Sequence, residues 1–330
     1  MRRLLTTAAV ATAAALTLTA CGTTEPAADS SDAKKAGEAI TLTDASGKKV
    51  ELDGPAKKVV GTEWHEVELL VSLGVDPVGV ADVKGYNTWD TAVPLKNAPK
   101  DIGTRGEPSM DTIAALEPDL IVASTDLPPA AVKQLRKVAP VLEVRSADAS
   151  DPIGRMTKNL DLVAKATGTT EQAEKLKDAF DAKVAEGKKA LADAGLDGAE
   201  FAFADGYDIS NQVSIRPFTS GSLIGAVNEE LGLKNAWTVE GDKDYGLGTS
   251  DVEGLTKLGD DVQFAYIAND GDKSSTPFTA TGALSKDKVW TSLPFVKKGN
   301  VHRLPDGIWM FGGQESMGAY IDALVKELTK

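Results

Sequence analysis

The stretch that decides the fold is Asp101-Ile-Gly-Thr-Arg105-Gly-Glu-Pro-Ser-Met-Asp111-Thr-Ile-Ala-Ala-Leu-Glu-Pro-Asp-Leu-Ile-Val-Ala-Ser124. It begins with a glycine-containing loop, and glycines let a backbone come close to a ligand. Pro108 and Ser109 are residue types favoured at helix starts, and the apolar residues after them have helical spacing. Leu120 to Ala123 is a continuous apolar run, typical of a parallel strand covered on both faces. The stretch therefore predicts an α/β fold, in which ligands bind beyond the carboxyl ends of the strands.

The same pattern recurs later in the chain. Four residues of the first stretch are matched in register by later ones: Asp111 by Glu253, Ile113 by Leu255, Leu116 by Leu258, and Asp119 by Asp261. An apolar run follows each set, so each set predicts a helix that leads into a buried strand. We interpret the recurrence as two related α/β lobes, each with a carboxylate at the same place on a helix.

Composition limits the function classes. The chain has 330 residues, of which 42% are hydrophobic and 26% charged, which is globular composition with room for two domains. The net charge of −13 argues against a nucleic-acid partner, because phosphate binding needs a basic face. Two histidines are too few for a histidine-rich metal site. The sequence has no Gly-x-Ser-x-Gly nucleophile elbow and no Cys/His pair, so hydrolase chemistry lacks a nucleophile. We expect neither an enzyme nor a cofactor.

The N-terminus has the features of an export signal. Residues 1–20 are predicted to be a lipoprotein signal peptide, because a basic start precedes an apolar run too short to span a bilayer. Leu18-Thr-Ala-Cys21 resembles the bacterial lipobox, in which the cysteine is lipidated; a plain secretory signal is the alternative. Residues 21–38 are predicted to be a disordered tether, since they lack apolar periodicity. These features predict a lipid-anchored protein on the extracytoplasmic face of the cell membrane.

The remaining chain divides into three parts. Residues 39–150 alternate strand and helix patterns after an initial hairpin, which predicts an N-terminal α/β lobe. Residues 151–195 carry two helical stripes, closed by Gly168 and Gly195, that either join the lobes or pack on one of them. Residues 196–330 return to alternation and predict a C-terminal α/β lobe that ends in a helix.

Several segments, taken in order, resemble the substrate-binding proteins of bacterial ABC importers for ferric siderophores and cobalamin, most closely the ferric-hydroxamate-binding lipoproteins. The segments are Val59-Val-Gly-Thr-Glu-Trp64, Leu73-Gly-Val-Asp-Pro-Val-Gly-Val-Ala-Asp82, Ile102-Gly-Thr-Arg-Gly-Glu-Pro108, Leu231-Gly-Leu-Lys-Asn-Ala-Trp237 and Trp290-Thr-Ser-Leu-Pro-Phe-Val-Lys-Lys-Gly-Asn-Val301. The resemblance implies a class III fold with two Rossmann-like lobes joined by a long α-helix. It also implies a monomer that captures a ferric siderophore and delivers it to an ABC permease and its ATPase.

The resemblance implies ligand-binding residues as well. The arginine of the Gly-Thr-Arg-Gly-Glu-Pro loop, here Arg105, would donate hydrogen bonds to hydroxamate oxygens, which a guanidinium fork suits. Trp89, Trp309 and Tyr245 match positions where this branch of the family has aromatic residues around the ligand. No protein atom is expected to coordinate the iron.

The sequence also departs from the hydroxamate branch. A tyrosine of that branch is missing near Leu127, and either Tyr86 or Trp64 could replace it. Arg216 is either a second hydrogen-bond donor from the other lobe or a surface arginine before a proline. His65 follows a predicted strand and could touch the ligand.

Docking on the permease through one carboxylate per lobe is a further implication of the resemblance. Asp111 and Glu253 match these positions, with Glu107 as an alternative in the first lobe; carboxylates stabilised by a helix dipole are the competing interpretation. Other readings stay open: the same scaffold holding cobalamin, haem or a catecholate siderophore, or a surface enzyme or adhesin. Whether the ligand is neutral or cationic also stays open.

Overall fold

The computed structural model describes residues 38–210 and 212–330. The predicted signal peptide, Cys21 and nearly all of the predicted tether lie outside the described residues. Among the described helices, none combines the length and the apolar character that crossing a bilayer requires.

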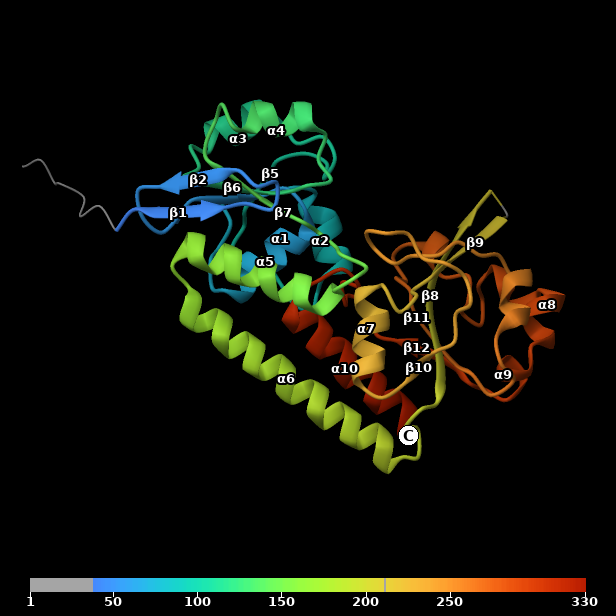
Figure 1. The fold of residues 1–330 in the computed structure, drawn as a ribbon. Helices are drawn as coiled ribbons and strands as arrows, with labels where there is room; N and C mark the ends of the chain where they lie inside the picture. The colour runs from blue at the N-terminus through green and yellow to red at the C-terminus, as the bar shows by residue number, and fades with distance from the viewer. Residues whose placement is uncertain (1–37, 211) are drawn as a thin grey trace, which may run out of the picture. The chain divides into compact units, whose positions relative to one another are not determined.

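The N-terminal half contains a five-stranded parallel sheet (Figure 1). Its strands, in spatial order, are β5 (Lys100–Asp101), β4 (Gly79–Val80), β3 (Val59–Gly61), β6 (Leu120–Ser124) and β7 (Val141–Val144). The helices of this half are α1 (Trp64–Ser72), α2 (Val83–Trp89), α3 (Met110–Ala115) and α4 (Pro129–Leu135). The predicted hairpin is present as β1 (Ile40–Thr43) and β2 (Lys49–Leu52), which pair antiparallel.

The stretch that the sequence analysis began with forms the predicted loop, helix and strand. Ser109 is the N-cap of α3, and its hydroxyl accepts a hydrogen bond from the Thr112 amide at 3.3 Å. All five residues of β6 are buried, which explains the unbroken apolar run in the sequence. Because β6 pairs with β3 and β7, this strand lies inside the sheet rather than at its edge.

Two helices connect the sheets along the chain, α5 (Pro152–Thr167) and α6 (Thr170–Asp193). Gly168 ends α5 with φ of 70°, a conformation that favours glycine. The α6 helix packs alongside α10 (Gln314–Leu328), as Figure 1 also shows. A Cβ atom at Gly187 would lie 2.8 Å from side-chain atoms of Ile321 and Leu231, so this glycine permits the close approach of α6 to α10 and to the end of α7 (Leu223–Glu230).

The C-terminal half repeats the plan of the first. Its strands, in spatial order, are β10 (Lys234–Asn235), β8 (Glu200–Ile209), β11 (Gln263–Ile267) and β12 (Val301–Leu304), all parallel. The helices are α7 (Leu223–Glu230), α8 (Lys288–Ser292), α9 (Pro294–Lys297) and α10, with 3₁₀ helices η1 (Glu253–Lys257), η2 (Lys273–Ser275) and η3 (Ala283–Lys286). The order β10-β8-β11-β12 corresponds to β4-β3-β6-β7, which confirms the two related α/β lobes.

Two details of this half differ from the prediction. The segment expected to repeat α3 is the short 3₁₀ helix η1, because Gly254 and Thr256 are weak helix formers. The first strand of this half, β8, also forms a hairpin with β9 (Gln212–Pro217), which was not predicted from the sequence.

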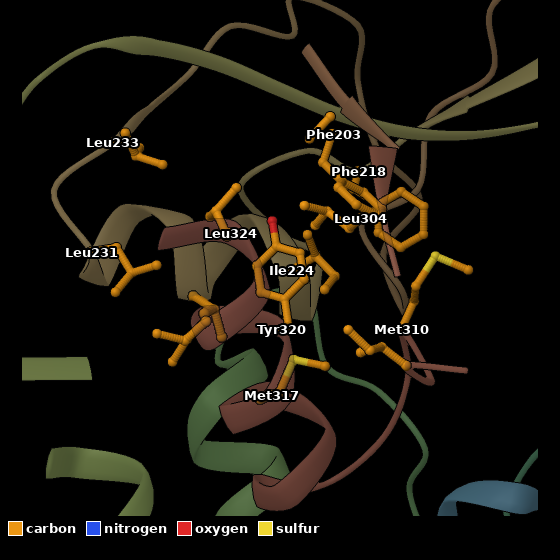
Figure 2. Packing of buried hydrophobic residues seen from close by; sticks show 14 of the residues in the cluster. Phe203, Phe218, Ile224, Leu231, Leu233, Leu304, Met310, Met317, Tyr320 and Leu324 are labelled. Atoms are coloured by element: carbon orange, nitrogen blue, oxygen red, sulfur yellow. The ribbon is translucent and has the colours of Figure 1, made fainter. Parts of the chain in front are cut away.

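The core of the C-terminal half surrounds Tyr320 of α10 (Figure 2). Figure 2 shows Tyr320 among Ile224, Leu324 and Phe203, and the Tyr320 hydroxyl donates a hydrogen bond to Asn228 Oδ1 at 2.8 Å. The rings of Phe203 and Phe218 meet edge to face with centroids 5.0 Å apart. Because Phe218 directly follows β9, the end of this strand is attached to the core.

A buried carboxylate caps the last helix. Glu68 of α1 accepts hydrogen bonds from the amides of Gly313 at 2.7 Å and Ser316 at 3.2 Å, at the N-terminus of α10. The Ser316 hydroxyl donates to Glu68 at 2.9 Å and lies 3.4 Å from an oxygen of buried Asp90. Burial raises the pKa of both carboxyl groups, to about 7 for Glu68 and to about 10 for Asp90. This cluster ties α1 to α10.

Candidate functional site

A cavity of about 500 Å³ receives residues from the carboxyl ends of strands in both sheets. From the first sheet come residues that follow β3, β5 and β7, and from the second come residues at or after the ends of β8, β11 and β12. The lining residues are Glu63, Trp64, His65, Trp89, Arg105, Ser146, Tyr207, Arg216, Tyr245, Leu247, Asp272, Trp309 and Phe311. The position agrees with the rule for ligand sites in open α/β sheets.

Arg105 lies in the cavity wall, where it stacks on Trp64 and forms an ion pair with Glu63. Its Nη1 donates to Glu63 Oε1 at 2.7 Å, and its guanidinium carbon lies 3.9 Å from the centroid of the Trp64 ring. The same Glu63 oxygen accepts from the Trp64 amide and so caps α1. Among the described residues, Nε and Nη2 of Arg105 have no hydrogen-bond acceptor. These two donors are therefore available to a ligand.

Arg216 belongs to the cavity wall of the other half. In the β8–β9 hairpin it faces Asp205, donating from Nε at 2.9 Å and also from Nη2. Asp205 is only 3% exposed; burial raises the pKa of its carboxyl, and the Arg216 guanidinium, which stays protonated in proteins, opposes that rise. The guanidinium carbon also lies 5.4 Å from the Phe311 ring centroid. Arg216 is thus in a strand beside the cavity rather than in a surface turn.

Aromatic rings form a large part of the lining. Trp64 and Trp309 meet edge to face with centroids 4.8 Å apart, and Phe311 lies 5.2 Å beyond Trp309. Trp64 donates its indole N–H to the Ala81 carbonyl at 3.2 Å. Trp309 is 8% exposed, and its indole N–H has no acceptor within the described part of the chain.

Trp89 and Tyr245 complete the aromatic positions that the sequence indicated. Trp89 is the last residue of α2 and lines the cavity. Tyr245 donates its hydroxyl to Asp126, and its ring meets Phe311 edge to face at 5.7 Å. Burial and the nearby Asp126 raise the pKa of the Tyr245 hydroxyl, so it stays a neutral donor.

His65 lines the cavity, but its ring nitrogens are already used. Nδ1 lies 3.1 Å from the Phe311 carbonyl, and Nε2 lies 3.1 Å from the Asn159 side-chain amide. The residue is 3% exposed, and burial lowers its pKa to about 4. We infer a neutral ring that donates from Nδ1 and accepts at Nε2, which leaves only ring carbons to face a ligand.

Tyr86 does not line the cavity. Its side chain is 0% exposed, and its hydroxyl donates to the Val93 carbonyl at 2.6 Å. Tyr86 is part of a buried cluster that includes Trp64 and Val67. The expectation that Tyr86 could replace the missing tyrosine is therefore contradicted by its burial, whereas Trp64 does line the cavity.

The three carboxylates considered for docking are exposed and lie outside the cavity. Asp111 is in the first turn of α3, and Glu253 is the first residue of η1, so they occupy equivalent places in the two halves. Glu107 lies in the loop that carries Arg105. Their docking role stays a prediction.

Six lining residues were not predicted from the sequence: Glu63, Ser146, Tyr207, Leu247, Asp272 and Phe311. Several of them carry a usable signal, because they come at or just after the end of a strand. Across residues 38–210 and 212–330, no three side chains among His, Cys, Asp and Glu are grouped so that they could hold a metal ion.

The chain is similar to known proteins in sequence and in fold. The sequence model of the periplasmic binding protein family matches residues 59–307. The chain is 25% identical over 267 residues to the iron(3+)-hydroxamate-binding protein FhuD of Escherichia coli, covering 81% of this chain and 85% of the relative. It is 28% identical over 265 residues to the Fe(3+)-citrate-binding protein YfmC of Bacillus subtilis, covering 79% and 77% respectively. The crystal structure of the Fe3+-Desferal-bound siderophore-binding protein FhuD from Vibrio cholerae superposes with a TM-score of 0.71 at 25% identity, covering 83% of this chain and 98% of that one.

Proposed function

The chain belongs to the periplasmic binding protein family, and we propose that it is the substrate-binding protein of an ABC importer that captures a ferric hydroxamate siderophore for iron uptake. It binds the intact iron chelate and releases it without chemical change. The iron stays coordinated by the siderophore, and the protein contacts only the organic shell. The relatives named above bind ferric hydroxamate or ferric citrate, so the choice among siderophore classes rests on the cavity of this chain.

The observation that carries the proposal is the cavity wall. Its volume of about 500 Å³ lies within the range of small-molecule sites, about 300–1,000 Å³. Its aromatic rings offer apolar surface to the organic backbone of a siderophore. Arg105 offers Nε and Nη2 to oxygens of the bound chelate, and Trp309 adds to the aromatic lining.

Charge favours hydroxamates over catecholates. Three hydroxamates, each with one negative charge, neutralise Fe³⁺, whereas three catecholates leave the chelate with three negative charges. Each cavity arginine already faces a carboxylate of the protein, Glu63 for Arg105 and Asp205 for Arg216. A trianionic chelate would therefore meet little uncompensated positive charge and would approach these two carboxylates, of which Asp205 is buried. A neutral or cationic chelate meets no such penalty.

Delivery uses a different surface. We propose that Asp111 and Glu253, exposed at equivalent places in the two halves, contact the permease, with Glu107 as the alternative in the first half. We also propose that Cys21 carries the lipid that holds the protein, as a monomer, at the extracytoplasmic face of the membrane. Both roles are independent of the cavity.

Fluorescence titration tests the proposal. Trp64, Trp89 and Trp309 line the cavity, so a bound iron chelate should quench their emission. We expect saturable quenching by ferrichrome and ferrioxamine B, and at least about tenfold weaker binding of ferric enterobactin, cobalamin and the iron-free siderophores. Tighter binding of the catecholate or of cobalamin would replace the hydroxamate assignment, and failure of every chelate to bind would end the proposal.

A further inference from the structure

The carboxylates at the cavity outnumber the arginines. Arg105 and Arg216 each have a carboxylate partner in the protein, as described above. Asp272 adds a further carboxylate to the lining. Among the described residues the lining contains no lysine, so the two arginines face three carboxylates: Glu63 and Asp272 in the lining, and Asp205 behind Arg216.

Asp272 lies where the chain leaves β11, just before η2. Its Oδ1 accepts hydrogen bonds from the Ser274 amide at 3.0 Å and from the Ser274 hydroxyl at 2.6 Å, which fixes the carboxylate. Within the part of the chain that the structure describes, Asp272 makes no ion pair, in contrast to Asp270 in the same loop, which pairs with Arg303 at 2.8 Å. Asp272 is thus a carboxylate that Ser274 keeps in position at the cavity and that has no basic partner among the described residues.

Tyr207 also responds to the negative charge at this end of the cavity. Tyr207, also in the lining, has its hydroxyl pKa raised to about 12, first by burial, then by Asp205 and, more weakly, by Asp272. Asp272 therefore lies close enough to the wall formed by β8 to act on a group there. Tyr245, which also lines the cavity, donates its hydroxyl to another carboxylate, Asp126.

The charge of a ferric chelate decides how it interacts with this excess of carboxylates. A ferric trihydroxamate core is neutral, so any net charge on the chelate is carried by pendant groups. An ammonium group at the end of a linear trihydroxamate gives the chelate one positive charge and can form a charge-assisted hydrogen bond with a carboxylate. A cyclic or acylated trihydroxamate has no such group.

We propose that Asp272 is a specificity-determining residue that selects ferric trihydroxamates with a pendant ammonium group over neutral ones of the same core. The inference rests on the proposed function, because it names the ligand subclass of the same cavity. Asp272 contributes through its charge, while Arg105 and the aromatic rings hold the chelate core.

The test compares two ligands that differ by one charge. Ferrioxamine B ends in an ammonium group, and N-acetylated ferrioxamine B has the same core without it. At low ionic strength we expect the wild-type protein to bind ferrioxamine B about three- to tenfold more tightly than the acetylated form. The preference should shrink as salt is added, since the interacting charges are only partly buried.

Asp272→Asn should abolish the preference, because its affinity for ferrioxamine B should fall to its affinity for the acetylated chelate. The asparagine oxygen can still accept from Ser274, so the loop keeps its hydrogen bonds. Asp270→Asn is the matched control, because it removes the same charge from the same loop at an exposed residue outside the lining, and it should keep the preference.

The possible results distinguish the role of Asp272 from the proposed function of the protein. Equal wild-type affinity for the two chelates, or a preference that persists in Asp272→Asn, overturns the role of Asp272 while the proposed function stands. Should Asp272→Asn unfold, the salt dependence of the wild-type preference decides: a preference unaffected by salt is not electrostatic and refutes the inference. If neither chelate binds, the proposed function itself has failed.

Discussion

Replacing Arg105 by alanine removes the one guanidinium that has free donors on the N-terminal side of the cavity. Nη1 is committed to Glu63, so Nε and Nη2 are the atoms that a hydroxamate oxygen can reach. Hydrogen bonds to charged groups are each worth about 1.5–3 kcal/mol. The loss of one such bond in Arg105→Ala corresponds to about ten- to 150-fold weaker binding of ferrichrome.

The same substitution should change stability little. The Arg105 side chain is 37% exposed, and ion pairs at such sites contribute at most about 1 kcal/mol. The assay is therefore fluorescence titration with ferrichrome, accompanied by a thermal melt that shows the variant is folded. Arg105→Lys keeps the charge but loses the planar fork, so its affinity should fall between those of the wild type and Arg105→Ala.

Arg303→Ala provides the control. Arg303 pairs with Asp270 and Asp306 outside the cavity lining, and its replacement should leave ferrichrome affinity within about twofold of the wild type. An Arg105→Ala protein that binds ferrichrome as tightly as the Arg303→Ala protein does would refute the reasoning, because the available donors would then contribute nothing to binding.

Three other predictions concern the aromatic wall, the docking surface and the buried acids. Trp309→Leu should weaken ferrichrome binding by about two- to tenfold in the same titration, since aromatic pairing is worth about 0.5–1.5 kcal/mol; unchanged affinity would assign Trp309 to packing alone. Asp111→Lys combined with Glu253→Lys should abolish iron uptake in cells while the purified protein keeps its ferrichrome affinity; lost affinity would show that these residues are misassigned. Burial keeps a proton on Asp90 in the folded protein that the unfolded chain releases near pH 4, so the contribution of Asp90 to stability should fall as pH rises above about 4 toward its raised folded pKa. Asp90→Asn removes this slope, so denaturant midpoints of the variant should exceed those of the wild type by a margin that grows from pH 6 to pH 9; a constant margin would mean that Asp90 is ionised in the folded protein.

Local signals in the sequence were enough to predict much of the fold. Ser109 and Gly168 mark helix ends through their own side-chain chemistry and backbone freedom, and the structure has them at the cap positions of α3 and α5. The apolar run at Leu120 reads as a buried strand because β6 is covered on both faces. These features depend only on neighbours along the chain.

Features that depend on distant partners were not predictable in the same way. Asp205 and Arg216 face each other across the β8–β9 hairpin, and the strand that carries Arg216 has no continuous apolar run to reveal it. The α2 helix is short and contains Gly85, so its propensity is weak and the inward direction of Tyr86 could not be inferred. The Glu63–Arg105 pair joins residues far apart in sequence, and only the assembled sheet brings them together.

The most direct test of the account is a crystal structure of the complex with ferrichrome. The account predicts the chelate in the cavity of about 500 Å³, with a hydroxamate oxygen within hydrogen-bonding distance of the Arg105 guanidinium. It also predicts Trp309 against the ligand and no protein atom bound to the iron. A chelate bound elsewhere on the protein, or one held in the cavity while Arg105 points away from it, would contradict the account.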